Sequence, residues 1–283
     1  MSEPWAVVTM LVAVPVAAVL ICQVAMCTTT VYLHRYLAHG GIQLRPEVRA
    51  VARILIWITT ALKPRQWARV HRYHHAAVDT ADDPHSPTNF GGSRRGAWVV
   101  LRRNCVLYTA ATRNERLIAK YRDLSADRWD RWFFDHGRAG LVVGITLVCA
   151  AMATLGHSLL DGWIGIALGV AVGAFAAGLH AVLYVLAGGA INGFGHANAA
   201  SPPNGGHARN MPLLAWLTAG EGWHSNHHAA ENSPRLGYAH QVDFGWLAIR
   251  GLQHLRLAHI TTRGTTGIDR LQNLHRTARL EQH

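Results

Sequence analysis

The chain has 283 residues, of which 50% are hydrophobic and only 15% are charged. Soluble domains carry about 25% charged residues, so this composition excludes a disordered chain and argues against a water-soluble globule. The formal net charge is +11 and 19 residues are histidine, while the 4 cysteines form no Cys-x-x-Cys pair. A cysteine-ligated zinc or iron–sulfur site is therefore not expected.

Three apolar segments are long enough to cross a bilayer, which takes about 20 residues per helix. The first runs from Trp5 to Leu33 without a charged side chain. A cleaved signal peptide is the alternative, but the chain starts Met-Ser-Glu-Pro and lacks the basic residues of such a leader. We predict membrane spans over about 5–33, 139–155 and 163–191.

The basic residues indicate how these spans are oriented. All 27 Lys and Arg residues lie within 34–138 and 209–283. The positive-inside rule then places 34–138 and 192–283 in the cytoplasm and the N-terminus outside. Topology and attraction to anionic lipid explain the charge, so no nucleic-acid partner is expected. We predict a single domain over 1–283, integral to the cell membrane.

A shorter apolar segment between the first two spans, Val48–Leu62, contains Arg49 and Arg53. We predict an interfacial helix whose arginines reach toward lipid headgroups. A full span is the alternative, and it would separate His71 from His34 across the membrane.

Histidines cluster within the predicted cytoplasmic segments. The first cluster has the pattern H-x4-H, the second and third have H-x2-HH, and a smaller N-x3-H feature follows the third span. Their members are His34 and His39; His71, His74 and His75; Asn192 and His196; His224, His227 and His228.

The spacing within these clusters indicates a metal centre. Residues at i, i+3 and i+4 share one face of a helix, whereas i and i+5 lie about 140° apart. We therefore expect a helix to end or bend at Gly40-Gly41, so that His34 and His39 reach one site. Imidazole suits iron, copper, nickel and zinc. Nine histidines are too many for one ion and fit two ions of four or five ligands each. Such a centre at a membrane suggests redox chemistry with O2 on an apolar substrate.

The order of these clusters carries a family resemblance. Residues 67–75 read WARVHRYHH, 82–87 read DDPHSP, 192–196 read NGFGH and 220–224 read GEGWH. With the spans between them, these motifs resemble the membrane-bound fatty acid desaturases, in particular the Δ9 acyl-CoA (stearoyl-CoA) desaturase group. The likeness runs from about Thr28 to Ile249. The third histidine cluster begins with His, whereas front-end desaturases have Gln there.

The resemblance implies an all-α membrane protein whose cytoplasmic helical cap holds two Fe ions. The nine histidines above would be the ligands, and Asn192 would bind through a water. O2 would be the co-substrate, and two hydrogens would leave a fatty acyl thioester, most plausibly of CoA, to give a cis double bond and water. No His-Pro-Gly-Gly haem motif occurs. Electrons would then come from a separate ferredoxin or cytochrome b5-type protein with its reductase.

Two departures from the family pattern stand out. Animal relatives have an additional span before the first histidine cluster. Bacterial relatives often carry aromatic residues where this chain has the small and polar segment 197–207.

Further residues are candidates for the site. Asp83 and Glu221 lie close in sequence to ligands and are predicted to orient imidazole N–H groups, with ordinary surface acids as the alternative. Trp67 is predicted to line an acyl tunnel, although packing explains it nearly as well.

The resemblance also implies that Arg69, Arg94 and Arg95 contact the CoA phosphates, for which the planar guanidinium is suited. Lipid-facing charges are the alternative for Arg94 and Arg95.

The other ten histidines have no assigned catalytic role. His180, within the third span, is predicted to form a hydrogen bond in helix packing. The C-terminal tail with His254, His259, His275 and His283 is expected to be a basic solvated segment.

Two other functions stay open at this point. A di-iron hydroxylase would use the same ligands and return oxygen to the acyl chain. A membrane metal-binding or transport protein is the alternative from another class, but it predicts histidines along a path through the bilayer.

Overall fold

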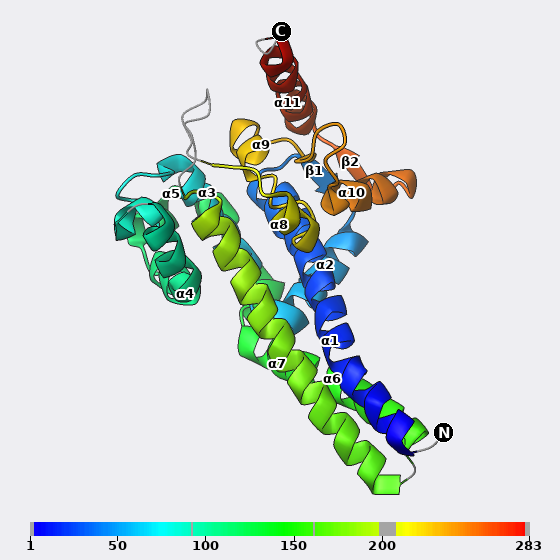
Figure 1. Ribbon diagram of the computed structural model, residues 1–283. Coiled ribbons are helices and arrows are strands. Elements are labelled where there is room, and N and C mark those ends of the chain that lie inside the picture. Colours follow the sequence, from blue (N-terminus) through cyan, green and yellow to red (C-terminus); the bar gives the residue numbers. More distant parts are fainter. Residues whose placement is uncertain (1–2, 92, 161, 198–207, 281–283) are drawn as a thin grey trace. The chain divides into compact units, whose positions relative to one another are not determined.

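The computed structural model describes residues 3–91, 93–160, 162–197 and 208–280. Nearly all of its regular structure is helical (Figure 1). The elements are, in chain order, α1 (Glu3–Thr28), η1 (Thr29–Ala38), β1 (Ile42–Leu44), α2 (Pro46–Thr60), α3 (Pro64–Ala77), η2 (Pro87–Phe90), α4 (Ser93–Ala111), α5 (Glu115–Lys120), η3 (Arg122–Leu124), η4 (Asp130–Phe134), α6 (Gly137–Leu159), α7 (Gly162–Phe194), α8 (Pro212–Leu217), α9 (His224–Ala229), α10 (Phe244–His254), β2 (Ala258–Ile260) and α11 (Thr262–Leu280).

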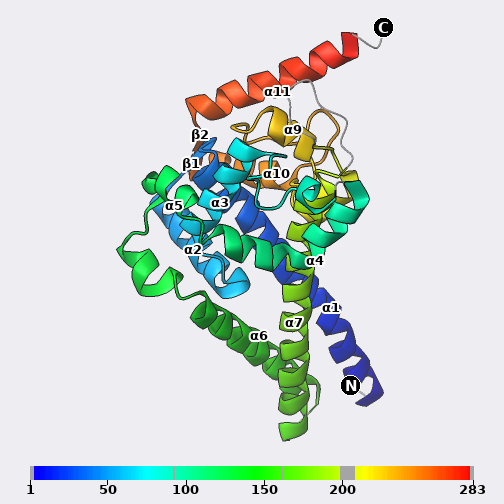
Figure 2. The ribbon, with the colours of Figure 1, turned by 90° about the vertical axis from the view of Figure 1, so that its left-hand side faces the viewer.

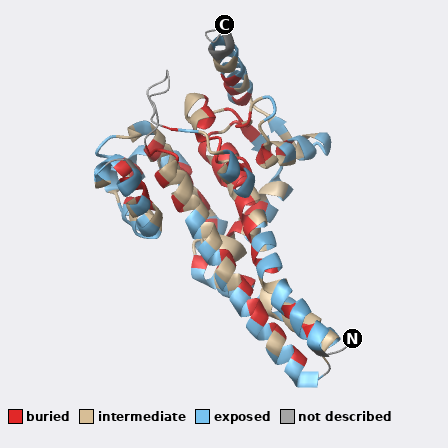
Figure 3. Ribbon diagram, viewed as in Figure 1, coloured by how far each residue is buried: buried red, intermediate tan, exposed pale blue. Residues whose placement is uncertain are grey.

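Three helical segments among the described residues are long and apolar enough to cross a membrane: Pro4–Ala38, Gly137–Leu159 and Gly162–Phe194. They confirm the predicted all-α membrane fold and the number of spans. Large apolar side chains such as Phe175 are exposed on them, and Figure 3 shows exposed residues along α6 and α7. Lipid tails are as apolar as these side chains, so this exposure is the pattern expected of a membrane-spanning helix.

The chain divides into two compact units. The first contains residues 1–25, 53–63 and 127–184, and the second contains 26–52, 64–126 and 185–283. Most of segment 197–207, and His283, lie outside the described residues.

In the first unit, α6 and the adjoining part of α7 form an antiparallel hairpin (Figure 2). Glycines allow the two backbones to approach each other closely, as is common between membrane helices. A Cβ on Gly169 would meet the carbonyl oxygen of Met152 and lie 2.6 Å from the Cα of Ala153. Gly173 would meet the Cα of Cys149 at 2.7 Å. The small side chains therefore set how closely the hairpin packs.

The predicted interfacial segment is helical, as α2, but Arg53 does not reach toward headgroups. Its guanidinium donates to the Asp127 carboxylate at 3.0 Å and to Asp130 at 2.6 Å. It also lies 4.4 Å from the ring centroid of Phe134. The expectation of a snorkelling Arg53 was wrong because two carboxylates of the same unit neutralise its charge locally.

His180 behaves as expected for a packing residue of the third span. Its Nε2 lies 2.8 Å from the carbonyl oxygen of Thr59 at the end of α2.

In the second unit, the C-terminal segment packs on the rest of the unit and is not the solvated tail that we expected. Strand β2 pairs antiparallel with β1, with His259 opposite Gln43. On α11, Leu271 is buried, and the His275 ring stacks on Tyr238 at 4.2 Å. The expectation was wrong because Leu271 is buried and Ile268 and Leu274 are partly covered on the packed face of α11.

The hairpin packing predicts opposite outcomes for two glycines of α7. Gly169→Ala forces the hairpin apart and should lower stability by about 1–3 kcal/mol. Gly178→Ala is the matched control, because its added Cβ would have no atom within 4 Å from the described residues beyond its own stretch of helix. That control should be neutral or stabilising by up to about 1 kcal/mol. Thermal unfolding of the detergent-solubilised protein measures both, and equal melting temperatures would contradict the close packing.

Candidate metal centre

The first histidine cluster lies on a π-helix. In η1 the amide of His39 donates to the carbonyl of His34 at 3.0 Å, an i to i+5 hydrogen bond. A π-helix has more residues per turn than an α-helix, so i and i+5 lie on the same face. Gly40 follows with a positive φ of 64°. The helix does end where we expected, but the wider turn brings His34 and His39 together.

The other clusters use the helical spacing that the sequence predicts. Helix α3 carries His71, His74 and His75, and the short helix α9 begins at His224 and carries His227 and His228. His196 lies in the turn directly after α7.

All nine histidines converge into two neighbouring groups in the second unit. Within each group the potential ligand nitrogens lie within 4.8 Å of one another. The first group contains His34, His39, His71, His75 and His227, and the second contains His74, His196, His224 and His228.

The nitrogen separations fit metal coordination. The Nε2 atoms of His39 and His71 are 2.8 Å apart, and those of His34 and His227 are 3.0 Å apart. In the second group, Nε2 of His224 is 2.9 Å from that of His196 and 3.2 Å from that of His228. Imidazole nitrogens bound to an ion at about 2.1 Å lie about 3 Å apart when their bonds are at right angles.

One buried nitrogen supports the same interpretation. Nε2 of His74 has no hydrogen-bond partner among the described residues. Buried polar atoms are nearly always paired, so an unpaired one requires an explanation. A metal ion among the second group would supply the partner, and the residues present therefore fit a metal centre.

Carboxylates lie at the opposite nitrogens of several of these rings. Nδ1 of His34 is 2.8 Å from Glu221, and Nδ1 of His74 is 3.0 Å from Asp83. Metal-binding histidines usually donate their second N–H to such a group, which sets the orientation of the ring. The structure thus places both carboxylates in contact with histidines of the clusters, although Glu221 contacts His34 and not His224, its neighbour in sequence.

Two further carboxylates escaped the sequence analysis. Glu231 lies 3.3 Å from Nδ1 of His75, and Asp79 lies 3.7 Å from Nδ1 of His196. Asp79 follows His75 by four residues and Glu231 follows His228 by three, so nearness to a cluster was the available signal. Nearness in sequence does not show which imidazole ring each acid approaches.

Burial sets the protonation of the cluster. Burial lowers the imidazole pKa well below its usual value, and neighbouring histidines lower it further, at His39, His71, His75, His224, His227 and His228. Neutral imidazole is the form that binds metal.

The pKa values of the Asp83 and Glu221 carboxyls are both lowered. Burial by itself raises the pKa of Asp83, but the charge and hydrogen bond of His74 outweigh it and lower the net pKa. At Glu221, burial is likewise outweighed by His34, with Arg35 and Thr30 contributing. Both groups therefore stay ionised beside the imidazoles they contact.

A buried ion pair ties the first cluster to the segment that carries the third. Arg35 donates to both carboxylate oxygens of Asp243, at 2.8 and 3.2 Å, and both side chains are buried. Arg35 also donates to the carbonyl of Pro234 at 2.8 Å. Asp243 in turn accepts from the amides of Leu236 and Trp246. The pair thus connects η1 to the chain that follows α9.

Trp67 lies against the centre. Its ring stacks on His71 at 4.9 Å with an interplanar angle of 7°. This contact restrains the orientation of that imidazole.

Asn192, the predicted water-binding residue, donates to Asn104 at 3.3 Å. It is therefore held by a side chain of α4.

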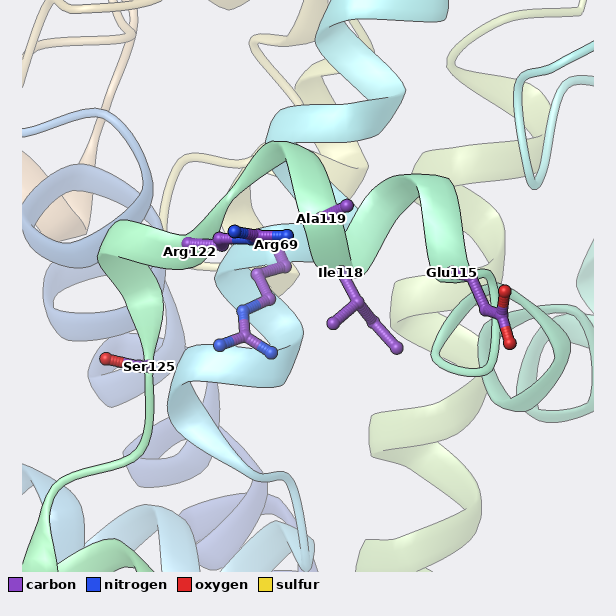
Figure 4. Close-up of a pocket in the computed structure, with 6 residues that line it drawn as sticks. All are labelled: Arg69, Glu115, Ile118, Ala119, Arg122 and Ser125. Atoms are coloured by element: carbon purple, nitrogen blue, oxygen red, sulfur yellow. The ribbon is translucent and has the colours of Figure 1, made fainter.

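The three arginines suggested for a CoA headgroup do not line one pocket. Arg69 lines a depression of about 420 Å³ with Arg122, as Figure 4 shows. Arg94 and Arg95 are exposed near the start of α4 and are not among the residues lining it.

His85, which had no assigned role, is buried beside the second group. Its ring stacks on His74 at 5.0 Å, and burial lowers its pKa to about 3. With His74 and Asp83 it forms a third set of potential ligands.

The family pattern of fatty acid desaturases matches residues 10–242 of this chain. The chain belongs to the fatty acid desaturase family. It is thus an integral membrane oxidoreductase of lipid metabolism with a histidine centre that can bind metal.

Three similar desaturase relatives illustrate the range of the family. The chain is 28% identical over 249 residues to the hex-5-enoyl-(acyl-carrier protein) acetylenase of Moorena producens. This alignment covers 82% of this chain and 72% of the acetylenase. It is 30% identical over 231 residues to the icosanoyl-CoA 5-desaturase of Limnanthes douglasii, covering 81% of this chain and 59% of that one. Identity to the Delta-9 desaturase-like 5 protein of Arabidopsis thaliana is 27% over 226 residues, covering 80% and 69%.

The Arg35–Asp243 pair predicts a large loss of stability on removal of one partner. Arg35→Met leaves a buried, uncompensated carboxylate and should cost about 3–5 kcal/mol. The matched control is Arg45→Met, because Arg45 pairs with Glu47 at 3.5 Å on the surface. That control should change stability by less than about 1 kcal/mol. Unfolding in detergent measures the stability of both variants. Equal losses would show that the buried pair does not stabilise the fold more than the surface pair does.

The Asp83–His74 contact predicts a loss of metal affinity. Asp83→Asn removes the charge that orients the imidazole and should weaken metal binding about 10- to 100-fold. Asp82→Asn is the matched control, since Asp82 is the exposed neighbour. Metal retained after dialysis against graded chelator gives both affinities. If the two variants retain metal equally, Asp83 has no part in holding the centre.

Proposed function

We propose that this desaturase removes two hydrogens from neighbouring carbons of a fatty acyl thioester, with O2 as co-substrate, and forms a cis double bond. The observation that carries the proposal is the convergence of nine imidazoles, six buried and three partly buried, into two adjacent groups of ligand nitrogens. Two metal ions fit this arrangement, and we assign them as iron. An unactivated C–H bond has no acidic proton, so acid–base groups cannot break it. Iron bound there would supply the capacity to activate O2 for that purpose.

The chain's own residues would hold this centre in place. His34 and His74 would donate the Nδ1 proton to Glu221 and Asp83, which would leave Nε2 of each ring available to a metal. Trp67, stacked on His71, restrains that ring. We propose that Asn192 joins the second group through a water, and that burial excludes bulk solvent.

The substrate class rests on the relatives and on Arg69. Their names include an acyl-carrier-protein and a CoA substrate, both thioesters. Arg69 and Arg122 line a common pocket, and guanidinium groups bind phosphate well. We therefore favour acyl-CoA and propose Arg69 as a headgroup contact. Arg94 and Arg95 remain candidates for a second one.

The position of the double bond and the topology are part of the same proposal. We favour Δ9 because the histidine motifs resemble that group, although several relatives are named for Δ5. The distribution of Lys and Arg supports a cytoplasmic centre, an external N-terminus and placement in the cell membrane. A separate ferredoxin or cytochrome b5-type protein would supply electrons.

Product analysis tests this function. We expect a host lacking its own desaturase to accumulate a cis-alkenoic acid when it expresses the protein, and His71→Ala to abolish the product. Stearoyl groups on CoA, carrier protein and lipid, offered to the purified protein, should identify the carrier, with alkene position read by mass spectrometry. A hydroxy acid without alkene would establish the hydroxylase instead. A protein without iron that is indifferent to His71→Ala would indicate metal binding or transport.

A further inference from the structure

One carboxylate at the centre differs from the others in its contact with solvent. The side chains of Asp83, Asp79 and Glu221 are 0%, 7% and 12% exposed. Glu231, which lies 3.3 Å from Nδ1 of His75, is 49% exposed. Among the described carboxylates that approach the histidine groups, Glu231 is thus the one that links a ring to the surface.

A pocket of about 310 Å³ opens at this carboxylate and reaches the first group directly. Its lining includes His39, His75, Arg72, Glu231 and Arg263. The rings of His39 and His75 line the pocket, and their own nitrogens belong to the first group. A molecule bound over the pocket is therefore one imidazole ring away from those nitrogens. Electron transfer slows steeply with distance, so a one-ring separation is favourable for it.

A second depression continues the first along α11. It has a volume of about 260 Å³, shares Glu231, Asn232 and Arg263 with the first, and adds Arg270. The two depressions together form what we call the Arg263 surface.

The charge of the Arg263 surface is positive. Its arginines are Arg72, Arg263 and Arg270, and Glu231 is the one carboxylate among the lining residues. Arg72 pairs with Asp123 at 2.7 Å, so the positive charge of the surface comes from Arg263 and Arg270. Arg72 is held in place, because it donates to the carbonyls of Ala38 at 2.7 Å and Leu37 at 3.0 Å. Arg263 and Arg270 are exposed on α11. A positive rim around a route to the centre favours an acidic partner.

We propose that the Arg263 surface is the docking site of a small acidic electron-transfer protein, and that electrons enter the centre through His75 and His39. This proposal rests on the proposed desaturase function. The reaction RCH2–CH2R′ + O2 + 2 e⁻ + 2 H⁺ gives RCH=CHR′ + 2 H2O. The docked protein is oxidised by one electron in each of two encounters, and solvent supplies the two protons. The acyl chain itself is apolar and does not suit this polar, charged lining.

Charge reversal on α11 tests the proposal. The probes are a plant-type [2Fe–2S] ferredoxin and a cytochrome b5, and the variants are Arg263→Glu, Arg270→Glu and the two combined. The matched control is Arg250→Glu, because Arg250 is exposed on α10 and lines neither depression. Equal melting temperatures and metal contents establish that each variant is folded.

We expect the double variant to bind the better of the two carriers about tenfold or more weakly at low salt, and the difference to shrink as salt rises. The same loss should appear in the metal-free protein, because docking needs only the surface. Reduction of the loaded protein by that carrier should slow by a similar factor, whereas reduction by reduced methyl viologen, a small cation, should not.

The result that would overturn the docking site is an affinity changed no more by the double variant than by Arg250→Glu. If neither carrier binds the wild type, equal rates of reduction of the wild type and the double variant by every protein donor tried would overturn the docking site as well. Alkene formation with methyl viologen as the reductant tests the desaturase function separately. Its absence in the wild type would refute that function without touching the binding result.

Discussion

The ion pair between Arg35 and Asp243 is the contact on which the metal centre depends most. Arg35 directly follows His34, and Asp243 is the N-cap of α10, beyond the third cluster. Because both charges are buried, loss of either one leaves the other without compensation. The amides of Leu236 and Trp246 bind the same carboxylate, so the pair also determines the path of the chain after α9. Residues far apart in sequence thereby reach one centre.

Burial and charge together set the protonation of the groups around this ion pair. Burial keeps most of the imidazoles neutral, the state that binds metal. Asp83 and Glu221 stay ionised in the same surroundings because each contacts an imidazole Nδ1. Glu231 makes the corresponding contact with His75 at the protein surface. The histidine groups are thus bordered by a buried carboxylate at Asp83 and by a surface carboxylate at Glu231.

The sequence predicts those features that depend on local periodicity. The spans, α3 and α9 follow from apolar length and from the i, i+3, i+4 spacing, and these were confirmed. The π-helix of η1 was not predictable, since the i, i+5 spacing is equally compatible with a helix end. Arg53 was misjudged because its partners Asp127 and Asp130 lie more than seventy residues away. Glu231 shows the same limit, because sequence proximity to His228 conceals its contact with His75.

The number of iron ions per chain tests the account most directly. Protein expressed with excess iron and purified in detergent should contain two iron ions per chain by elemental analysis. His224→Ala, which removes a ligand of the four-histidine group alone, should leave about one, held by the five-histidine group. One ion in the wild type, or equal loss of both ions in this variant, would contradict a centre built from two separate ligand groups.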